Sequence, residues 1–193
     1  MDTSLYLIIN GWAGRVRFID EIFKGISNDY FAVLLGCLTL LWLWFATRDK
    51  ASRDKVQKAV LMAAMSIGFA GAMVDICNIF YTRPRPFMTL PASSVHILFY
   101  RPTDSSFPSN FASIMFAFVI PVIFANRKYG LWLLGLALIT SFGRVFMGIH
   151  YPLDVTAGAV IGILTGFLAM GVGWVINPVM DYILLVLRKI GIA

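Results

Sequence analysis

Three short stretches of this sequence hold residues whose types and spacing are suited to phosphate chemistry. The first, residues 81–87, reads YTRPRPF and places Arg83 and Arg85 next to prolines, which fix the backbone and present both guanidinium groups stiffly. Arginine suits this role because its planar guanidinium binds phosphate in a bidentate manner. Taken alone, the stretch fits a phosphate site and a pair of interfacial arginines that meet lipid headgroups equally well.

The second stretch, residues 105–110, reads SSFPSN and precedes a long apolar segment. Ser109 or Asn110 is a suitable N-cap for a helix at this point. The free backbone N–H groups at a helix N-terminus attract anions. Simple capping without a ligand is nevertheless the better explanation when this stretch is taken alone.

The third stretch, residues 143–154, contains Arg144, His150 and Asp154. Arg144 lies inside an apolar segment, where a charge normally faces a partner or a cavity because burying it is costly. His150 and Asp154 are four residues apart, so we expect the carboxylate to hold one ring nitrogen and raise the basicity of the other. A lone His–Asp pair is more often structural, but the arginines and the helix N-terminus predicted on the same face favour a functional site over a structural pair.

The composition indicates that a membrane positions these stretches. Of 193 residues, 59% are apolar and 13% are charged, and the mean hydropathy is +0.80. Soluble domains usually have about 45–50% apolar and roughly 25% charged residues. These values exclude a disordered chain, a nucleic-acid-binding module and an ordinary cytosolic enzyme. We therefore predict one integral membrane domain over residues 1–193, with membrane lipids and no nucleic acid as partners.

The predicted fold is an all-α bundle of about five transmembrane helices. A span needs about 20 mostly apolar residues, and the segments that qualify are 30–46, 59–81, 107–125, 129–149 and 155–180. Residues 1–28 are predicted to form an interfacial helix because segment 5–26 mixes apolar and charged side chains. A further short helix is expected over 182–187. Residues 82–106 are predicted to form a long outer loop, whose length suggests a lid or a substrate-gating element. Glycines at spacing four in the last span predict close helix packing: Gly158, Gly162 and Gly166.

The distribution of basic residues predicts the orientation of the bundle. Five alternating spans place the basic side chains of segments 48–58, 127–128 and 188–189 on one face. The other face receives Arg15, Arg17, Lys24, Arg83, Arg85, Arg101 and Arg144. Once the last four are set aside as site residues, the positive-inside rule places the first face in the cytoplasm. The three stretches then meet at the outer face.

These residues, in this order, resemble the type 2 phosphatidic acid phosphatase (PAP2) superfamily of membrane phosphatases. The family pattern is Lys-x6-Arg-Pro, then Pro-Ser-x-His, then Ser-Arg-x5-His-x3-Asp. It is matched here by RP at 85–86, PS at 108–109, and Arg144 with His150 and Asp154. The resemblance extends from about residue 59 to residue 180. Within the superfamily the chain is most similar to undecaprenyl pyrophosphate phosphatases of the bacitracin-resistance type.

The resemblance implies a role for each matching residue. His150 would be the nucleophile that forms a phosphohistidine, and Asp154 would orient it. The phosphoryl oxygens would be held by the groups at the family's phosphate-binding positions: Arg85, Ser109, Arg144 and the backbone N–H groups near Asn110. The family implies no cofactor and no metal. It also implies an isoprenoid or glycerolipid phosphate as the substrate, and a bacterial inner membrane with the active site on the periplasmic face.

The chain departs from the family pattern in ways that bear on substrate choice. Asn78 replaces the family lysine, and Arg83 is a candidate to supply the missing charge. Gly143 replaces the serine before Arg144, a small change. Phe111 replaces the histidine that protonates the leaving group, a contribution worth about 10²–10⁴-fold in rate for a general acid. A diphosphate expels a lipid phosphate that is already a stable anion, so we predict a preference for isoprenyl diphosphates over phosphatidate-like monoesters.

Other functions remain open on the sequence. One is a phosphatidate- or phosphatidylglycerophosphate-type phosphatase, or a phosphotransferase that uses the same phosphohistidine with another acceptor. Another is a catalytically impaired member that only binds lipid phosphate, which Phe111 and Asn78 favour. The intact pair of His150 and Asp154 argues against it, because a binding protein needs no oriented nucleophile. The sequence makes no prediction of the oligomeric state.

Overall fold

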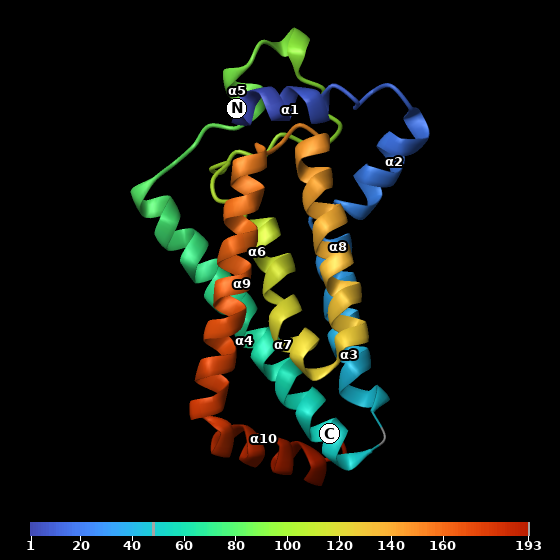
Figure 1. Ribbon diagram of the computed structural model, residues 1–193, viewed down its shortest axis with the longest axis vertical. Helices are drawn as coiled ribbons and strands as arrows, with labels where there is room; N and C mark the ends of the chain where they lie inside the picture. Colours follow the sequence, from blue (N-terminus) through green and yellow to red (C-terminus); the bar gives the residue numbers. More distant parts are fainter. Residues whose placement is uncertain (48, 193) are drawn as a thin grey trace.

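The computed structural model describes residues 1–47 and 49–192, and within these ranges it contains helices and loops but no strand (Figure 1). The bundle consists of six helices: α3 (Phe31–Ala46), α4 (Lys50–Phe80), α6 (Asn110–Ala117), α7 (Val119–Ala125), α8 (Arg127–Phe146) and α9 (Pro152–Val175). Shorter helices lie at its ends: α1 (Asp2–Asn10), α2 (Arg17–Ile26), α5 (Pro86–Thr89), the 3-10 helix Ala92–Ser94 and α10 (Asn177–Lys189). The predicted all-α fold is confirmed.

The lengths of the apolar helices support an integral membrane protein. Within the described ranges, α4, α8 and α9 are each long and apolar enough to cross a membrane. Helices α2 and α3 pass the same test only as a pair, which is bent by 52°, and the apolar helix Asn110–Ala125 is shorter. The structure therefore has three or four candidate spans, and the count of five stays a prediction.

The predicted span 107–125 is broken into α6 and α7, which lie in the middle of the bundle (Figure 1). Pro121 has no backbone N–H, so it cannot bond the carbonyl of Ala117 four residues earlier. The hydroxyl of Ser66 in α4 donates to that carbonyl at 2.8 Å. A buried serine thus satisfies the acceptor that the proline leaves free, and α4 is fixed to the break.

Helix α9 packs closely on α6 because its contact face is made of glycines. A Cβ atom at Gly158 would lie 2.4 Å from the carbonyl oxygen of Ser109, and one at Gly162 would lie 2.4 Å from that of Ser113. At Gly166 a Cβ atom would meet a side chain of α7 at 2.7 Å. The predicted close packing is confirmed, and it places the start of α9 against the start of α6.

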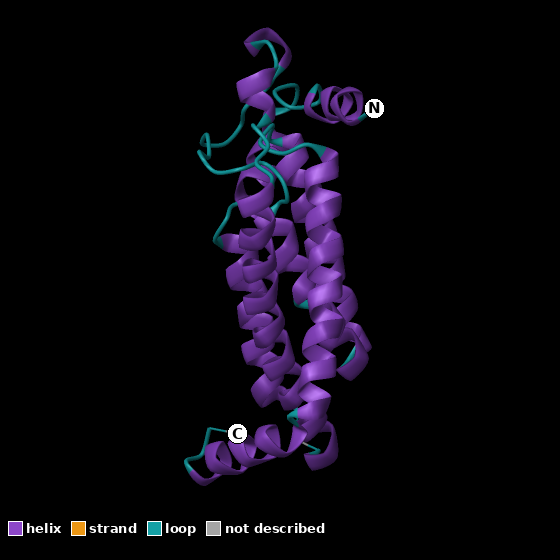
Figure 2. Cartoon of the chain, turned by 90° about the vertical axis from the view of Figure 1, so that its left-hand side faces the viewer, coloured by secondary structure: helices purple, strands orange, loops and turns teal. Residues whose placement is uncertain are grey.

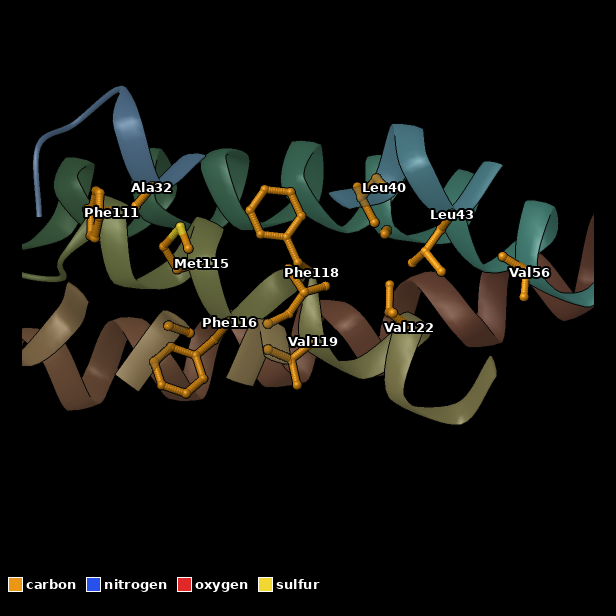
Figure 3. Close-up of a cluster of buried hydrophobic side chains, with 13 residues drawn as sticks. Ala32, Leu40, Leu43, Val56, Phe111, Met115, Phe116, Phe118, Val119 and Val122 are labelled. Atoms are coloured by element: carbon orange, nitrogen blue, oxygen red, sulfur yellow. The ribbon is translucent and has the colours of Figure 1, made fainter. Parts of the chain in front are cut away.

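A single cluster of buried side chains joins α6 and α7 to α3, α4 and α8. Figure 3 shows the row that α6 and α7 contribute, from Phe111 through Met115 and Phe118 to Val122. Phe111 lies at one end of this row beside Ala32 of α3. The core therefore extends from the middle of the bundle up to the end where α6 begins.

Two predicted elements at the ends of the chain are wrong in their bounds. The single interfacial helix over 5–26 is divided into α1 and α2, and the loop between them turns at Gly14, whose φ is +80°. The last span ends at Val175 rather than at residue 180, because Asn177 and Pro178 begin α10, which crosses the far end of the bundle (Figure 1). The short helix predicted over 182–187 lies inside α10.

Loops gather at one end of the molecule. The segment 82–106, which includes α5 and the 3-10 helix, lies at the same end as α1, whereas α10 and the C-terminus lie at the other end (Figure 2). Asn10 of α1 fastens this loop, since its amide donates to the carbonyl of His96 at 2.7 Å and its oxygen accepts from the N–H of His96 at 2.8 Å. The three motifs meet beneath these loops.

Candidate active site

A cavity of about 200 Å³ opens at the loop end of the bundle. It is bounded by the loop 82–106, the start of α6, the end of α8, the loop before α9 and the segment between α2 and α3. The lining residues are Asp29, Val33, Arg85, Tyr100, Pro102, Asp104, Asn110, Phe111, Ile114, Arg144 and His150. The structure thus brings all three sequence motifs to one cavity.

His150 is held in the state that a nucleophile needs. It lies between α8 and α9, and only 2% of it is exposed. Its Nδ1 is 2.9 Å from the carbonyl oxygen of Ser106, and its Nε2 is 3.1 Å from Nη1 of Arg85. A carbonyl only accepts and a guanidinium only donates, so we assign the proton to Nδ1 and the free electron pair to Nε2.

Burial lowers the pKa of His150 to about 4, and the positive charges of Arg85 and Arg144 act in the same direction. The ring is therefore neutral near pH 7. A neutral imidazole that lines a cavity with a free electron pair on Nε2 can attack an electrophilic phosphorus.

Asp154 does not hold the imidazole directly, and that prediction is wrong. Its Oδ2 is 3.9 Å from Nδ1 of His150, beyond hydrogen-bond distance. Helical i,i+4 proximity does not apply here, because α9 begins at Pro152 and leaves His150 outside the helix. Asp154 instead accepts from the hydroxyl of Ser106 at 2.5 Å and from the N–H of Tyr151 at 2.8 Å. Ser106 therefore bridges the pair, with its hydroxyl on Asp154 and its carbonyl on His150.

Arg85 is buried and turned into the cavity. It forms the N-cap of α5 in an extended conformation, between the two prolines that restrict the backbone. Its Nη1 donates to the carbonyl of Ile149 at 2.8 Å and faces His150. Its Nε and Nη2 bond Asp104, to the carbonyl oxygen at 3.1 Å and to Oδ1 at 2.9 Å. A phosphoryl group on Nε2 of His150 would meet this guanidinium.

Arg144 forms another wall of the cavity near the end of α8. Its Nη1 lies 2.5 Å from Oδ1 of Asp29, and its guanidinium carbon lies 4.5 Å from the centre of the Phe111 ring. The hydroxyl of Tyr100 donates to Oδ2 of Asp29 at 2.5 Å. Burial and Asp29 raise the pKa of Tyr100 to about 12, so the phenol keeps its proton. Each cavity arginine thus has a carboxylate partner.

The start of α6 contributes differently from what its motif predicts. Ser109 is fully buried and is the N-cap of α6, where its Oγ accepts from the N–H of Ala112 at 3.4 Å. Its own N–H donates to the carbonyl of Asp154 at 3.0 Å, and its side chain does not line the cavity. Asn110 and Phe111 do line the cavity. A direct contact of Ser109 Oγ with phosphate therefore stays a prediction.

Two auxiliary residues lie outside the cavity. Arg83 bonds Asp154 at 2.6 Å and Asp2 at 2.7 Å, and its guanidinium carbon lies 3.9 Å from the centre of the Tyr151 ring. Arg83 does not line the cavity, so the idea that it supplies a missing phosphate-binding charge stays a prediction. Asn78, near the end of α4, does not line the cavity.

Four cavity or supporting residues receive no role in the motif analysis, although the last lies in the second stretch: Asp29, Tyr100, Asp104 and Ser106. Three of them lie in the long outer loop, whose predicted role as a lid is the one signal that points to them. Within the residues that the structure describes, the side chains of His, Cys, Asp and Glu form no group of three or more that would hold a metal ion. Metal-independent chemistry stays a prediction.

This geometry agrees with the family to which the sequence points. Residues 59–177 match the model of the PAP2 superfamily, and the chain belongs to that superfamily. It is 30% identical over 191 residues to undecaprenyl-diphosphatase BcrC of Bacillus subtilis (strain 168), which covers 98% of this chain and 93% of the relative. It is 27% identical over 176 residues to an undecaprenyl-diphosphatase of Sulfolobus acidocaldarius, which covers 86% of this chain and 84% of the relative. The predicted similarity to undecaprenyl pyrophosphate phosphatases is confirmed.

A solved structure supports the same assignment. The crystal structure of Aquifex aeolicus LpxE superimposes with a TM-score of 0.71 at 25% sequence identity, and it covers 88% of this chain and 94% of that chain. The arrangement of the helices is therefore shared with that structure.

Proposed function

We propose that this chain hydrolyses a polyprenyl diphosphate, undecaprenyl diphosphate in particular, and releases inorganic phosphate. The observation that carries the proposal is the neutral His150, whose Nε2 pair lies in a cavity walled by Arg85 and Arg144. The names of the relatives from B. subtilis and S. acidocaldarius support the choice of substrate.

The residues of the cavity suit a double displacement at phosphorus. Nε2 of His150 attacks the terminal phosphorus, the bond to the bridging oxygen breaks, and its electron pair leaves on the lipid phosphate. Arg85 and Arg144 stabilise the charge on the phosphoryl oxygens. The carbonyl of Ser106 holds the proton on Nδ1 and so stabilises the positive charge that the ring gains on phosphorylation. Water then attacks the phosphorus and the P–N bond breaks, which returns the electron pair to Nε2.

Phe111 favours a diphosphate substrate over a monoester. The ring lines the cavity but offers no proton. A monoester expels an alkoxide-like oxygen that needs protonation in the transition state, whereas a diphosphate expels a phosphate anion. A glycerolipid monophosphate or a transfer reaction is the alternative. A protein that only binds phosphate does not need a histidine whose tautomer is fixed by contacts at both ring nitrogens.

The ends of the bundle support the proposed location, a bacterial inner membrane with the site on the periplasmic face. The basic residues that favour the cytoplasm lie at the starts of α4 and α8 and at the end of α10. Helix α10 crosses the end of the bundle opposite α1 and α5 (Figure 1). Arg188 of α10 reaches Asp54 of α4 at 2.6 Å, which gathers these charges at that end. The positive-inside rule then directs the cavity outward.

The test is phosphate release by the purified protein in detergent, with undecaprenyl diphosphate and phosphatidate as substrates. We expect release from the diphosphate, little release from phosphatidate, and none from either in His150→Ala. His96→Ala is the matched control, because the other histidine of the chain does not line the cavity. Undiminished release in His150→Ala would refute the proposed nucleophile, and equal turnover of both lipids would refute the preference.

A further inference from the structure

Loss of a proton-transfer group at position 111 affects both halves of the proposed reaction. The first half tolerates it, because the leaving lipid phosphate is a stable anion. The second half does not, since water attacks the phosphohistidine and must give up a proton whatever lipid has left. A group that serves as the acid in the first step of a double displacement normally serves as the base in the second. Another base in the cavity is therefore needed.

Most of the titratable groups near the cavity are already committed. Both oxygens of Asp29 are engaged, one by Arg144 and the other by the hydroxyl of Tyr100. Tyr100 keeps its proton, because its pKa is raised to about 12. Asp154 is fully buried, does not line the cavity and is on the Nδ1 side of His150.

Asp104 is the carboxylate that remains. Its Oδ1 is 2.9 Å from Nη2 of Arg85, and Nη1 of the same guanidinium is 3.1 Å from Nε2 of His150. Asp104 and His150 thus contact the two neighbouring terminal nitrogens of the Arg85 guanidinium. A phosphoryl group on Nε2 is bound next to that guanidinium, and the attacking water must approach from the side away from Nε2. Asp104 and His150 also line the same cavity, so a water in that cavity can contact the carboxylate.

The exposure of Asp104 also fits this task. Its side chain is 70% exposed, so water reaches it and a proton can leave it. Its Oδ2 forms no hydrogen bond within the part of the chain that the structure describes, while Oδ1 is fixed by Arg85. One oxygen thus orients the carboxylate, and the other is open to solvent.

We propose that Asp104 is a catalytic residue that activates the water which hydrolyses the phosphohistidine. The inference rests on the proposed function. The water oxygen bonds to phosphorus, the P–N bond breaks with its electron pair returning to Nε2 of His150, and the water proton moves to the carboxylate of Asp104. The proton then leaves to solvent, which restores the site after inorganic phosphate departs.

The decisive experiment separates the two halves of the reaction in Asp104→Asn. With undecaprenyl diphosphate labelled in its terminal phosphate, this variant should form one equivalent of lipid monophosphate per protein in a burst and retain label on His150. Steady-state turnover should fall by about 10²–10⁴-fold, the usual contribution of a general base. The double variant Phe111→His with Asp104→Asn should regain turnover, because a proton acceptor returns at the family position.

Asp29→Asn is the matched control, since it removes the same charge from the other arginine pair of the cavity. We expect it to retain no label on His150. The inference is overturned if the wild-type protein is active and Asp104→Asn either keeps its turnover or loses the burst and turnover together. A wild-type protein that releases no phosphate refutes the proposed function, and the inference falls with it.

Discussion

Replacing Gly158 by alanine should damage the site without touching a cavity residue. Gly158 lies in the first two turns of α9, and its Cα faces the carbonyl of Ser109, the N-cap of α6. A Cβ atom there would lie 2.4 Å from that oxygen and 3.0 Å from Cβ of Ala112. The nearer contact involves backbone, which cannot rotate away, so the two helices must separate.

The magnitude follows from the size of this overlap. Relieving the contact to an ordinary van der Waals separation needs a shift of roughly 1 Å, and overpacking of this kind costs about 1–3 kcal/mol. Alanine regains about 1 kcal/mol through its higher helix propensity. The net loss of unfolding free energy should be up to about 2 kcal/mol. A misplacement near 1 Å can reduce turnover by about 10²-fold, because Asn110 and Phe111 move with the start of α6 relative to His150.

The measurements are thermal unfolding in detergent and phosphate release from undecaprenyl diphosphate. Gly171→Ala in the same helix is the control, because a Cβ at Gly171 has no neighbour within 4 Å. This control should gain stability and keep its turnover. If Gly158→Ala behaves like Gly171→Ala in both measurements, the close approach of α9 to α6 does not position the site.

Other predictions concern the supports of the site. Burial lowers the pKa of His150 from 6.5 to about 4, so the unfolded chain binds more protons than the folded chain between these pH values. The unfolding free energy should therefore fall by up to about 3 kcal/mol as the pH drops from 6.5 to 4. Denaturation of the wild type and of His150→Gln at several pH values measures this, and an identical pH dependence of the two would contradict it. Arg83→Gln removes the guanidinium from the fully buried Asp154 and should lower the unfolding free energy by roughly 3 kcal/mol, with Arg101→Gln as the surface control in the same assay. Ser66→Ala leaves the carbonyl of Ala117 without a partner and should cost about 1–3 kcal/mol. Ser113→Ala should cost less than Ser66→Ala, because the Ser109 carbonyl that it serves still accepts the N–H of Ser113, and an equal loss would argue against the role of Ser66 at the break.

The elements that the sequence predicts well are those whose signal is local. Apolar length located α3, α4, α8 and α9, apart from their ends, and the spacing of Gly158 and Gly162 predicted close helix packing, for which the structure provides α6 as the partner. The motif residues Arg85, Arg144 and His150 also meet as predicted, because successive spans alternate between the faces of a membrane. Pro121 was a local signal too, and it accounts for the break that the predicted span 107–125 lacks.

The remaining features depend on contacts between distant segments. Asp29 reaches Arg144 across 115 positions, and Arg83 bonds both Asp2 and Asp154. No periodicity encodes such pairs, since each depends on where a loop crosses the end of the bundle. A direct hydrogen bond from His150 to Asp154 was wrongly predicted for a related reason, because the start of the helix decides whether residues at an i,i+4 spacing reach hydrogen-bond distance.

Phe111 shows why a site residue cannot be understood from its motif alone. Its ring belongs to the buried row that α6 and α7 present to the core (Figure 3). The same ring lines the cavity and lies 4.5 Å from the guanidinium carbon of Arg144. A cation over an aromatic face is stabilised by the ring quadrupole, more so where water is excluded. The side chain that stands in place of the family's proton donor therefore helps to hold Arg144, the arginine proposed to bind phosphate. On the proposed mechanism, this substitution keeps phosphate binding and leaves the proton chemistry to Asp104 in the loop.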